Sequence, residues 1–425
     1  QELYSRYLQY PSVQTDTRQL KHNDIFFALK GPNFNGNKYA QQALDAGAAY
    51  AVIDEKEFYI DERTIVVEDA LATLQALALH HRKTFQIPFI GITGSNGKTT
   101  TKELVHAVLS SQYKTYTTKG NLNNHIGVPL TILSIKQDAE MAIIEMGANH
   151  QKEIESYCTI ALPTHGLITN CGKAHLEGFG SEEGIRKGKG ELFDFLRANG
   201  GTAFIMADYD YLRPMSQGIQ NIITYGTQNA DITGTIQSVD PFLTVQFQTG
   251  FKGFINTALV GGYNLPNVLA AVAVGKHFGV PDEKIKTSIE AYQPSNSRSQ
   301  LVSKGDNKII VDAYNANPSS MKVAIDNFAR TAADNKVLVL GAMAELGTTS
   351  LQEHQELVDQ IGRHNWKAVL LVGGDFAKLE HPYQQFSNAA EAGEWLQAQA
   401  FDCAYYLIKG SRSMKMEGVL QYIKE

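Results

Sequence analysis

One segment near residue 95 has the residue types and order of a phosphate-binding loop. It reads Gly91-Ile-Thr-Gly-Ser-Asn-Gly-Lys98-Thr99, with an apolar stretch before it and a helical pattern, Glu103–Leu109, after it. Glycines let backbone N–H groups turn inward around phosphate oxygens, and the N-terminus of a following helix favours negative charge. Lys98 would neutralise the β- and γ-phosphates, and Thr99 would ligate Mg²⁺. The segment therefore predicts binding of a nucleoside triphosphate.

Two further polar residues stand where they can extend this site. Glu145 ends an apolar stretch that begins at Ile143, and a strand-end carboxylate there can reach a Mg²⁺ ion held by Thr99. Glutamates at strand ends are usually solvated, but the apolar neighbours on both sides favour the metal role. His175 lies in the glycine-containing segment 169–180, which can present a neutral imidazole to a metal. A lone histidine is as often structural, so chemistry alone leaves His175 open.

A basic cluster follows in Arg186-Lys187-Gly-Lys189. Such clusters usually form a solvated face. A lysine beside a metal ion would be repelled unless its charge were changed. Residue types alone therefore give Lys189 no role in the site.

Short apolar stretches alternate with helical ones along the whole chain, which is typical of α/β structure. Residues 1–84 form a small α/β domain in this interpretation, with a helix over Ala70–Phe85 leading to a boundary before Pro88. Residues 85–294 form a central P-loop ATPase domain with a mostly parallel sheet, although alternation within 230–260 indicates antiparallel strands.

Residues 295–425 repeat the strand–helix alternation and predict a third, Rossmann-like domain. In such sheets ligands bind at the carboxyl ends of the strands. Asp312, Gly341 and Lys409 each follow an apolar strand directly, so they are candidate site residues. The turn-rich segment Gln293-Pro-Ser-Asn-Ser297 is a candidate hinge between the last two domains.

The composition limits the possible partners of this 425-residue chain. Its formal net charge is −6, so nothing global favours nucleic acid or an anionic membrane. The apolar runs have the length of strands, far below the roughly 20 residues of a membrane helix, and no signal peptide opens the chain, although Gln1 is not an initiator residue. Three separated cysteines form no metal or redox motif. We expect a cytoplasmic monomer that does not insert into membranes.

Five segments together resemble the Mur ligases in order and spacing. They are the glycine-rich loop, Lys119-Gly-Asn-Leu-Asn-Asn-His-Ile-Gly-Val-Pro129, Glu145-Met-Gly147, Ala174-His-Leu-Glu-Gly-Phe-Gly-Ser181 and Lys189-Gly-Glu191. Two later motifs look like signatures of the branch that adds D-alanyl-D-alanine to UDP-N-acetylmuramoyl-tripeptide. These are Asp312-Ala-Tyr-Asn-Ala-Asn-Pro-Ser-Ser-Met321 and Lys409-Gly-Ser-Arg-Ser-Met-Lys-Met-Glu417. The resemblance spans all three expected domains.

The resemblance implies a role for each matching residue. Catalysis would involve Lys98, His175, Lys189 and Arg298. Two Mg²⁺ ions would be held by Thr99, Glu145, His175 and Lys189, the last of these carbamylated by CO₂ and so converted from a cation into an anion. ATP would be bound by Gly94, Asn96, Gly97, Lys98, Thr99, Thr100, Asn264, Asn267, Arg298 and Asp312.

The substrate residues implied by the resemblance are spread over all three domains. The N-terminal domain would grip uridine diphosphate, and the asparagines of the central domain would meet the muramoyl group. The C-terminal residues belong to segments associated with the incoming dipeptide and the tripeptide tail. The residues are Thr17, Arg18, Asn121, Asn124, Tyr314, Asn315, Asn317, Lys409 and Arg412. The implied reaction is ATP-dependent ligation through an acyl phosphate, in the synthesis of peptidoglycan precursors.

Departures from the family pattern leave alternatives open. Ala342 stands where the family commonly has Asp, and Tyr263 stands where His often precedes the adenine-region Asn264. One alternative is another acid–amino-acid ligase of the same superfamily, such as a folylpolyglutamate synthase-like enzyme, which the two late motifs disfavour. The other is a nucleotide-binding regulatory module without catalysis, which the intact metal constellation disfavours.

Overall fold

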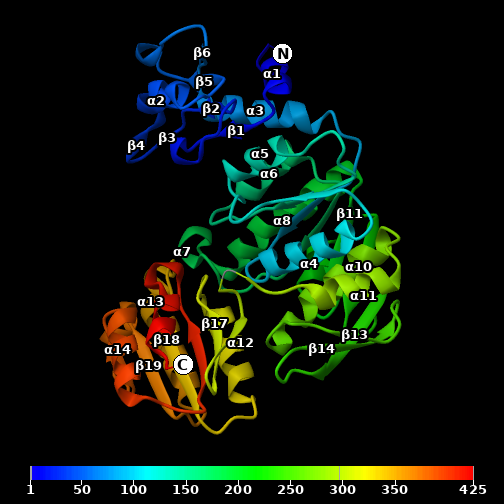
Figure 1. Cartoon of the computed structure of the whole chain (residues 1–425). Helices are drawn as coiled ribbons and strands as arrows, with labels where there is room; N and C mark the ends of the chain where they lie inside the picture. Colours follow the sequence, from blue (N-terminus) through cyan, green and yellow to red (C-terminus); the bar gives the residue numbers. More distant parts are fainter. Residues whose placement is uncertain (1, 296, 425) are drawn as a thin grey trace.

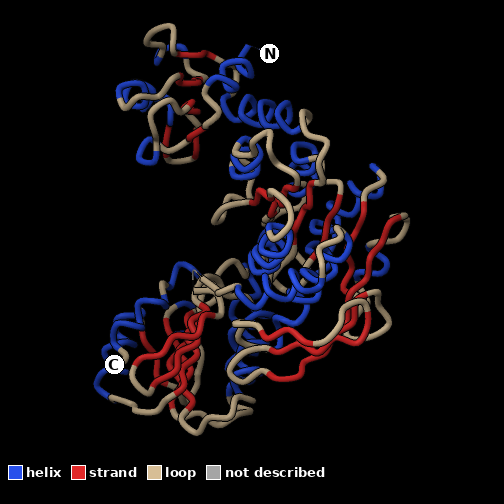
Figure 2. The backbone as a smooth tube through the Cα atoms, turned by 45° about the vertical axis from the view of Figure 1, so that its right-hand side comes forward, coloured by secondary structure: helices blue, strands red, loops and turns tan. Residues whose placement is uncertain are grey.

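The computed structural model describes residues 2–295 and 297–424, and these form three α/β domains, each built on its own larger sheet (Figure 1). In Figures 1 and 2 the N-terminal domain lies at one end of the central domain, and the C-terminal domain lies at the other. The predicted boundaries after residues 84 and 294 fall in loops, after helix α3 (Ala70–Arg82) and after α11 (Asp282–Ala291). Their exact positions stay predictions. Asn296, in the predicted hinge, lies outside the described residues.

The N-terminal domain is a parallel sheet with strand order β1-β2-β5-β6. Its strands are β1 (Val13–Gln14), β2 (Ile25–Phe27), β5 (Tyr50–Ile53) and β6 (Thr64–Val66). A small hairpin, β3 (Lys30–Gly31) and β4 (Phe34–Asn35), and the helices α1 (Glu2–Gln9) and α2 (Ala40–Asp45) complete it. Helix α3 packs against α5 (Gly127–Leu133) and α6 (Glu153–Ala161) of the central domain and so joins the two domains.

The central domain is a nine-stranded sheet with order β15-β14-β13-β12-β11-β10-β7-β9-β8. The parallel strands are β8 (Thr115–Thr117), β9 (Met141–Glu145), β7 (Phe89–Thr93), β10 (His165–Ile168), β11 (Thr202–Met206), β12 (Asn221–Gly226) and β13 (Ile232–Ser238). The antiparallel end expected within 230–260 is confirmed, because β14 (Thr244–Thr249) and β15 (Phe254–Asn256) run antiparallel to their neighbours.

The helices of the central domain cover this sheet and carry its buried core. They are α4 (Lys98–Ser110), α5 (Gly127–Leu133), α6 (Glu153–Ala161), α7 (Leu176–Phe179), α8 (Glu182–Asn199), α9 (Leu212–Met215), α10 (Leu265–His277) and α11. Strands β7 and β9 are buried along their whole length, which explains their unbroken apolar sequences.

The C-terminal domain is a six-stranded sheet with order β16-β17-β21-β18-β19-β20. Its strands are β16 (Gln300–Lys304), β17 (Asn307–Asp312), β18 (Lys336–Gly341), β19 (Ala368–Val372), β20 (Gln384–Phe386) and β21 (Tyr405–Lys409). All but β16 are parallel. Helices α12 (Pro318–Ala329), α13 (Ser350–Ile361) and α14 (Ala389–Gln399) cover it.

Two predicted helix boundaries were wrong. The helix after the glycine-rich loop begins at Lys98 rather than Glu103, because Gly97, with φ of 78°, turns the chain directly into it. The helix predicted to reach Phe85 ends at Arg82. None of the helices formed by residues 2–295 and 297–424 has the length and hydropathy of a membrane span.

Candidate functional site

The glycine-rich loop between β7 and α4 is braced by the segment that follows β10. The backbone N–H of Ser95 donates to the Asn170 carbonyl at 2.9 Å, and Thr169 Oγ1 donates to the Asn96 carbonyl at 2.6 Å. Gly94 has φ of 143°, and a side chain there would clash with Thr169. The loop is therefore held in an open curve with Lys98 at its end.

Lys98 extends its ammonium group across this loop. Nζ donates to the carbonyls of Gly94 at 2.7 Å and Ser95 at 3.3 Å. Burial lowers the pKa of Lys98, and the positive charge of Arg298 lowers it further, while Glu145 opposes the shift. The half-buried cation is thus placed where the phosphates of a nucleotide would meet the N-terminus of α4.

Glu145, at the end of β9, points its buried carboxylate at Thr99. Thr99 Oγ1 lies 3.2 Å and 3.1 Å from the two carboxylate oxygens, and Asn123 Nδ2 donates to Oε1 at 2.8 Å. Lys102 Nζ lies 3.9 Å from Oε2 and is itself buried. Thr99 and Glu145, which the sequence predicted to lie together, are therefore in direct contact.

His175 lies in the segment between β10 and α7 and contacts the C-terminal domain. His175 has φ of 54°, and its Nδ1 lies 2.5 Å from Oε2 of Glu345 in the C-terminal domain. Nδ1 is buried, and its N–H is poorly aligned with that oxygen, so the contact is close but is not a well-formed hydrogen bond. This contact lowers the pKa of the Glu345 carboxyl.

Lys189, on α8, is 1% exposed, and its Nζ donates to the Ala148 carbonyl at 3.0 Å. Burial, with a smaller contribution from the charge of Lys98, lowers the pKa of Lys189 to about 7. Lys187, two residues earlier, is exposed. The basic cluster is therefore solvated at Lys187, as its composition suggested, but not at Lys189, which faces the protein interior.

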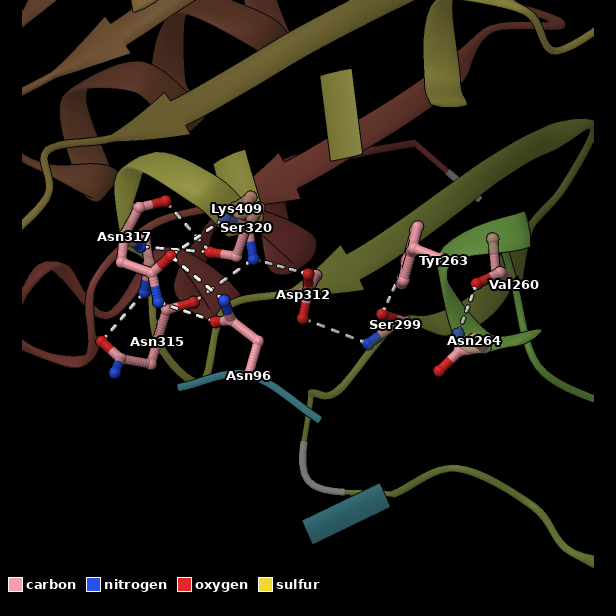
Figure 3. Close-up of polar contacts among 11 residues, drawn as sticks. Asn96, Val260, Tyr263, Asn264, Ser299, Asp312, Asn315, Asn317, Ser320 and Lys409 are labelled. Atoms are coloured by element: carbon pink, nitrogen blue, oxygen red, sulfur yellow. Dashed lines mark hydrogen bonds and ion pairs between the residues drawn. The ribbon is translucent and has the colours of Figure 1, made fainter. Parts of the chain in front are cut away.

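The C-terminal domain closes the other side of the site (Figure 3). Lys409 Nζ lies 2.6 Å from Oδ2 of Asp312, and both residues end neighbouring strands, β21 and β17. Arg298 stacks on the ring of Tyr314, with 3.5 Å between the guanidinium carbon and the ring centre. Lys409 is 2% exposed. A ligand that reaches its ammonium group would therefore also meet the Asp312 carboxylate paired with it.

Direct hydrogen bonds join the central and C-terminal domains around this site. Asn317 Nδ2 donates to Oδ1 of Asn96 at 2.7 Å (Figure 3). Tyr263 Oη donates to Ser299 Oγ at 2.7 Å, and the Ser299 N–H donates to Asp312 at 3.3 Å. The tyrosine that replaces the family histidine thus anchors the segment after the predicted hinge.

A cleft of about 910 Å³ brings most of the predicted residues together. From the central domain it is lined by Asn96, Gly97, Lys98, Thr99, Thr100, Asn121, Asn124, Glu145, His175, Asn264 and Asn267. From the C-terminal domain it is lined by Arg298, Asp312, Tyr314, Asn315, Asn317 and Lys409. The two asparagines expected near adenine are buried and hydrogen-bonded to each other at 2.9 Å.

Five predicted residues do not line this cleft. Gly94 is not part of the cleft lining but shapes the phosphate loop. Lys189 is not part of the lining either, and it faces the Ala148 carbonyl. Thr17 and Arg18 lie in the N-terminal domain, and the Arg18 side chain is exposed and paired with Asp16 at 2.7 Å. Arg412 is exposed, 5.6 Å from the centre of the Tyr314 ring. The roles predicted for these residues stay predictions.

Comparison with known proteins assigns all three domains of the chain to one family. The sequence model of the Mur ligase family, catalytic domain, matches residues 9–82, that of the Mur ligase middle domain matches 92–275, and that of the Mur ligase, glutamate ligase domain, matches 297–412. The chain belongs to the Mur ligase family. The fold described above is therefore that of a Mur ligase.

Individual relatives agree with this assignment over nearly the full length. The UDP-N-acetylmuramoyl-tripeptide–D-alanyl-D-alanine ligase of Bacillus subtilis is 34% identical, over 97% of this chain and 93% of that relative. A crystal structure of MurF from Acinetobacter baumannii is 31% identical, with a TM-score of 0.87 over 96% of this chain and 92% of that one. A MurF ligase from Thermotoga maritima in complex with ADP is 26% identical, with a TM-score of 0.86 over 98% and 97%.

The structure also places residues in this Mur ligase site that sequence reasoning did not select. Lys102 lies one helical turn after Lys98, and that spacing was a usable signal. Glu345 comes from the segment flagged for Ala342, and nothing local in the sequence indicated its contact with His175. Ala342 itself is buried, and its carbonyl accepts from Ser411 Oγ at 2.7 Å, so this position serves packing.

Proposed function

We propose that this protein uses ATP to join D-alanyl-D-alanine to UDP-N-acetylmuramoyl-tripeptide, in the synthesis of peptidoglycan precursors. The observation that carries this proposal is the cleft that combines the phosphate loop and Glu145 with Asp312, Asn317 and Lys409 of the C-terminal domain. The printed activity of the full-length Bacillus subtilis relative supports the choice of substrates. The ADP complex of the Thermotoga maritima relative supports the choice of nucleotide.

The reaction needs an activated acid, because hydroxide is a poor leaving group. Transfer of the γ-phosphoryl group of ATP to the terminal carboxylate of the tripeptide gives an acyl phosphate. The amine of D-alanyl-D-alanine then attacks the acyl carbon, phosphate leaves with one former carboxylate oxygen, and the amine loses a proton. This chemistry depends mainly on positioning and charge neutralisation, for which Lys98 and Arg298 supply cations from two domains.

The residues around Glu145 fit magnesium. Mg²⁺ takes oxygen ligands and usually binds through one or two carboxylates together with phosphates and water. The Thr99 hydroxyl and the Glu145 carboxylate are already in contact and supply two such oxygens. Magnesium would supply neutralisation of the phosphate charge when bound. Thr99 and Glu145 would hold one ion, and His175 would contribute to a second.

Carbamylation of Lys189 would complete the second metal position. CO₂ reacts with a neutral amine, forming an N–C bond and releasing one proton, and the product is an anion. The Lys189 amine is buried beside the site and is held by the Ala148 carbonyl, and its lowered pKa provides the neutral form near pH 7. An anion at this position would also remove the repulsion between Lys189 and a metal ion.

The N-terminal domain has the remaining substrate role in this proposal. Thr17 and Arg18 would bind the uridine diphosphate, and the exposed Arg18 guanidinium suits a phosphate partner once it leaves Asp16. Asn121 and Asn124 line the cleft and would meet the muramoyl group. Tyr314, Asn315 and Arg412 would meet the peptide groups.

Phosphate release with substrates omitted one at a time tests this proposal. We expect release to need ATP, Mg²⁺, the UDP-muramoyl tripeptide and D-alanyl-D-alanine together. A single amino acid that replaces the dipeptide with equal efficiency would instead indicate another Mur ligase activity. Nucleotide binding without any release in the complete mixture would indicate a regulatory module.

A further inference from the structure

The contact between His175 and Glu345 crosses the interface between the central and C-terminal domains. His175 Nδ1 lies 2.5 Å from Glu345 Oε2, and a backbone hydrogen bond of 3.2 Å runs from the Glu177 N–H to the Glu345 carbonyl beside it. His175 and Glu345 have positive φ angles of 54° and 60°, a backbone conformation that residues other than glycine rarely adopt. The two loops therefore meet through a side-chain contact and a backbone hydrogen bond.

The choice of nitrogen matters for metal binding. A neutral histidine that donates its Nδ1–H to an acceptor keeps the lone pair on Nε2 for a ligand. Histidines that bind metals usually donate their other ring N–H to a carboxylate or carbonyl, which fixes the tautomer and the ring orientation. Among the residues that the structure describes, no group forms a hydrogen bond with His175 Nε2, while Nδ1 is buried against Glu345.

We propose that Glu345 is a positioning residue that holds His175 in the Nδ1–H tautomer, so that closure of the C-terminal domain prepares Nε2 to bind a divalent cation. This inference rests on the proposed function, because it assigns a partner to the expected second metal ligand. His175 Nδ1 and Glu345 Oε2 are 2.5 Å apart, so a small rotation of either side chain would align the Nδ1–H, and such hydrogen bonds often tighten in a loaded complex.

The Glu345 carboxylate comes from the C-terminal domain, whereas His175 and Lys189, the expected ligands of the second cation, come from the central domain. The second cation site would therefore be complete only when the two domains are in contact. Binding of the cation and closure of the domains would then favour each other, because each stabilises the same arrangement.

A second ion pair across the same interface supplies a matched control. Lys173 Nζ lies 2.9 Å from Glu353 Oε1, and the backbone N–H of Lys173 donates to Ser319 Oγ at 2.8 Å. Glu353→Gln weakens the contact between the domains and leaves His175 untouched. Glu345→Gln keeps the size of the side chain and a neutral acceptor, and Glu345→Ala removes the acceptor.

The first readout needs neither metal nor activity. NMR of the protein with ¹⁵N-labelled histidine, free of metal and nucleotide, reports the tautomer of His175, assigned with His175→Gln. We expect wild type and Glu353→Gln to show Nδ1–H, and Glu345→Ala to lose this preference. An unchanged His175 signal in Glu345→Ala would overturn the proposal.

The second readout is Mn²⁺ binding in the presence of ADP, followed by electron paramagnetic resonance. We expect Glu345→Ala to weaken the His175-dependent site by roughly tenfold to a hundredfold, with Glu345→Gln between it and wild type. Equal weakening in Glu353→Gln would overturn the proposal in favour of a simple loss of domain contact. If wild type bound Mn²⁺ no better than His175→Gln, the second metal site of the proposed function would itself be wrong.

Discussion

The side chain of Asn317 donates a hydrogen bond of 2.7 Å to the side chain of Asn96, which joins the N-terminus of α12 to the phosphate loop. The same Asn317 side chain caps α12 by accepting the N–H of Ser320 at 2.9 Å. One residue therefore orders a helix in the C-terminal domain and contacts the nucleotide loop of the central domain. The domains meet directly at the point where the phosphates are expected.

Asn317→Ala should both weaken α12 and loosen this contact. Loss of a helix N-cap costs about 1 kcal/mol of stability, which urea unfolding would measure. The KM for ATP should rise as well, because the loop loses its partner. Asn317→Asp keeps the cap and should restore most of the stability. A KM equal to that of wild type in both variants would show that the Asn96 contact has no part in nucleotide binding.

Lys98→Ala should abolish ADP formation while leaving the fold intact. Among residues 2–295 and 297–424, Lys98 donates only to backbone carbonyls of its own loop, so its removal takes no hydrogen-bond donor from a buried carboxylate described there. The loss of a cation at the transferred phosphate should lower kcat by at least about a hundredfold. Unchanged turnover, with circular dichroism as for wild type, would exclude the role of the phosphate loop.

Lys102→Met should make folding depend on magnesium. Lys102 Nζ is the cation 3.9 Å from the buried Glu145 carboxylate, and breaking a buried pair costs about 3 kcal/mol. Unfolding measured without Mg²⁺ should show this loss, and Mg²⁺ with ADP should restore more stability to the variant than to wild type. An equal gain in both proteins would indicate that Lys102 only anchors Thr118, whose carbonyl accepts from Nζ at 2.8 Å.

Lys189 gives the stability a defined pH dependence in the metal-free, unmodified protein. The pKa of Lys189 is lowered from 10.5 to about 7 by burial, so between these values the unfolded chain binds a proton that the folded chain does not. The free energy of unfolding should therefore rise with pH across this window. Lys189→Met should flatten that rise in urea unfolding, and parallel curves for the two proteins would contradict the shift.

The carbamate proposal has a separate test. Lys189→Ala should be nearly inactive, because the second cation loses its anionic ligand, and short carboxylates such as formate or acetate should partly restore activity. The control is Lys187→Ala, which changes an exposed lysine of the same cluster and should remain active. Full activity of Lys189→Ala, with no response to added carboxylates, would rule the carbamate out.

The sequence predicted the parts of the site that depend on local structure. The glycine-rich loop and Glu145 each follow an apolar strand, and parallel strands place their carboxyl ends together, so the contact between Thr99 and Glu145 could be inferred. The ends of apolar strands also indicated Asp312 and Lys409, and the resemblance added Arg298. Neither indicated the ion pair between Asp312 and Lys409.

The contacts between domains could not be predicted in the same way. Glu345 reaches His175 only because two separately folded domains close on each other, and no periodicity or spacing encodes that arrangement. The burial of Lys189 also depends on how α8 packs against the segment around Ala148. Such relationships follow from tertiary packing, which a local pattern does not describe.

Transfer of oxygen from the substrate carboxylate to phosphate tests the central claim most directly. The terminal carboxylate of the UDP-muramoyl tripeptide would be labelled with ¹⁸O and incubated with the protein, ATP, Mg²⁺ and D-alanyl-D-alanine. We predict that each released phosphate carries one ¹⁸O atom, because the carboxylate oxygen leaves with the phosphoryl group. Phosphate released without label, alongside formation of the amide product, would contradict activation of the acid by phosphorylation.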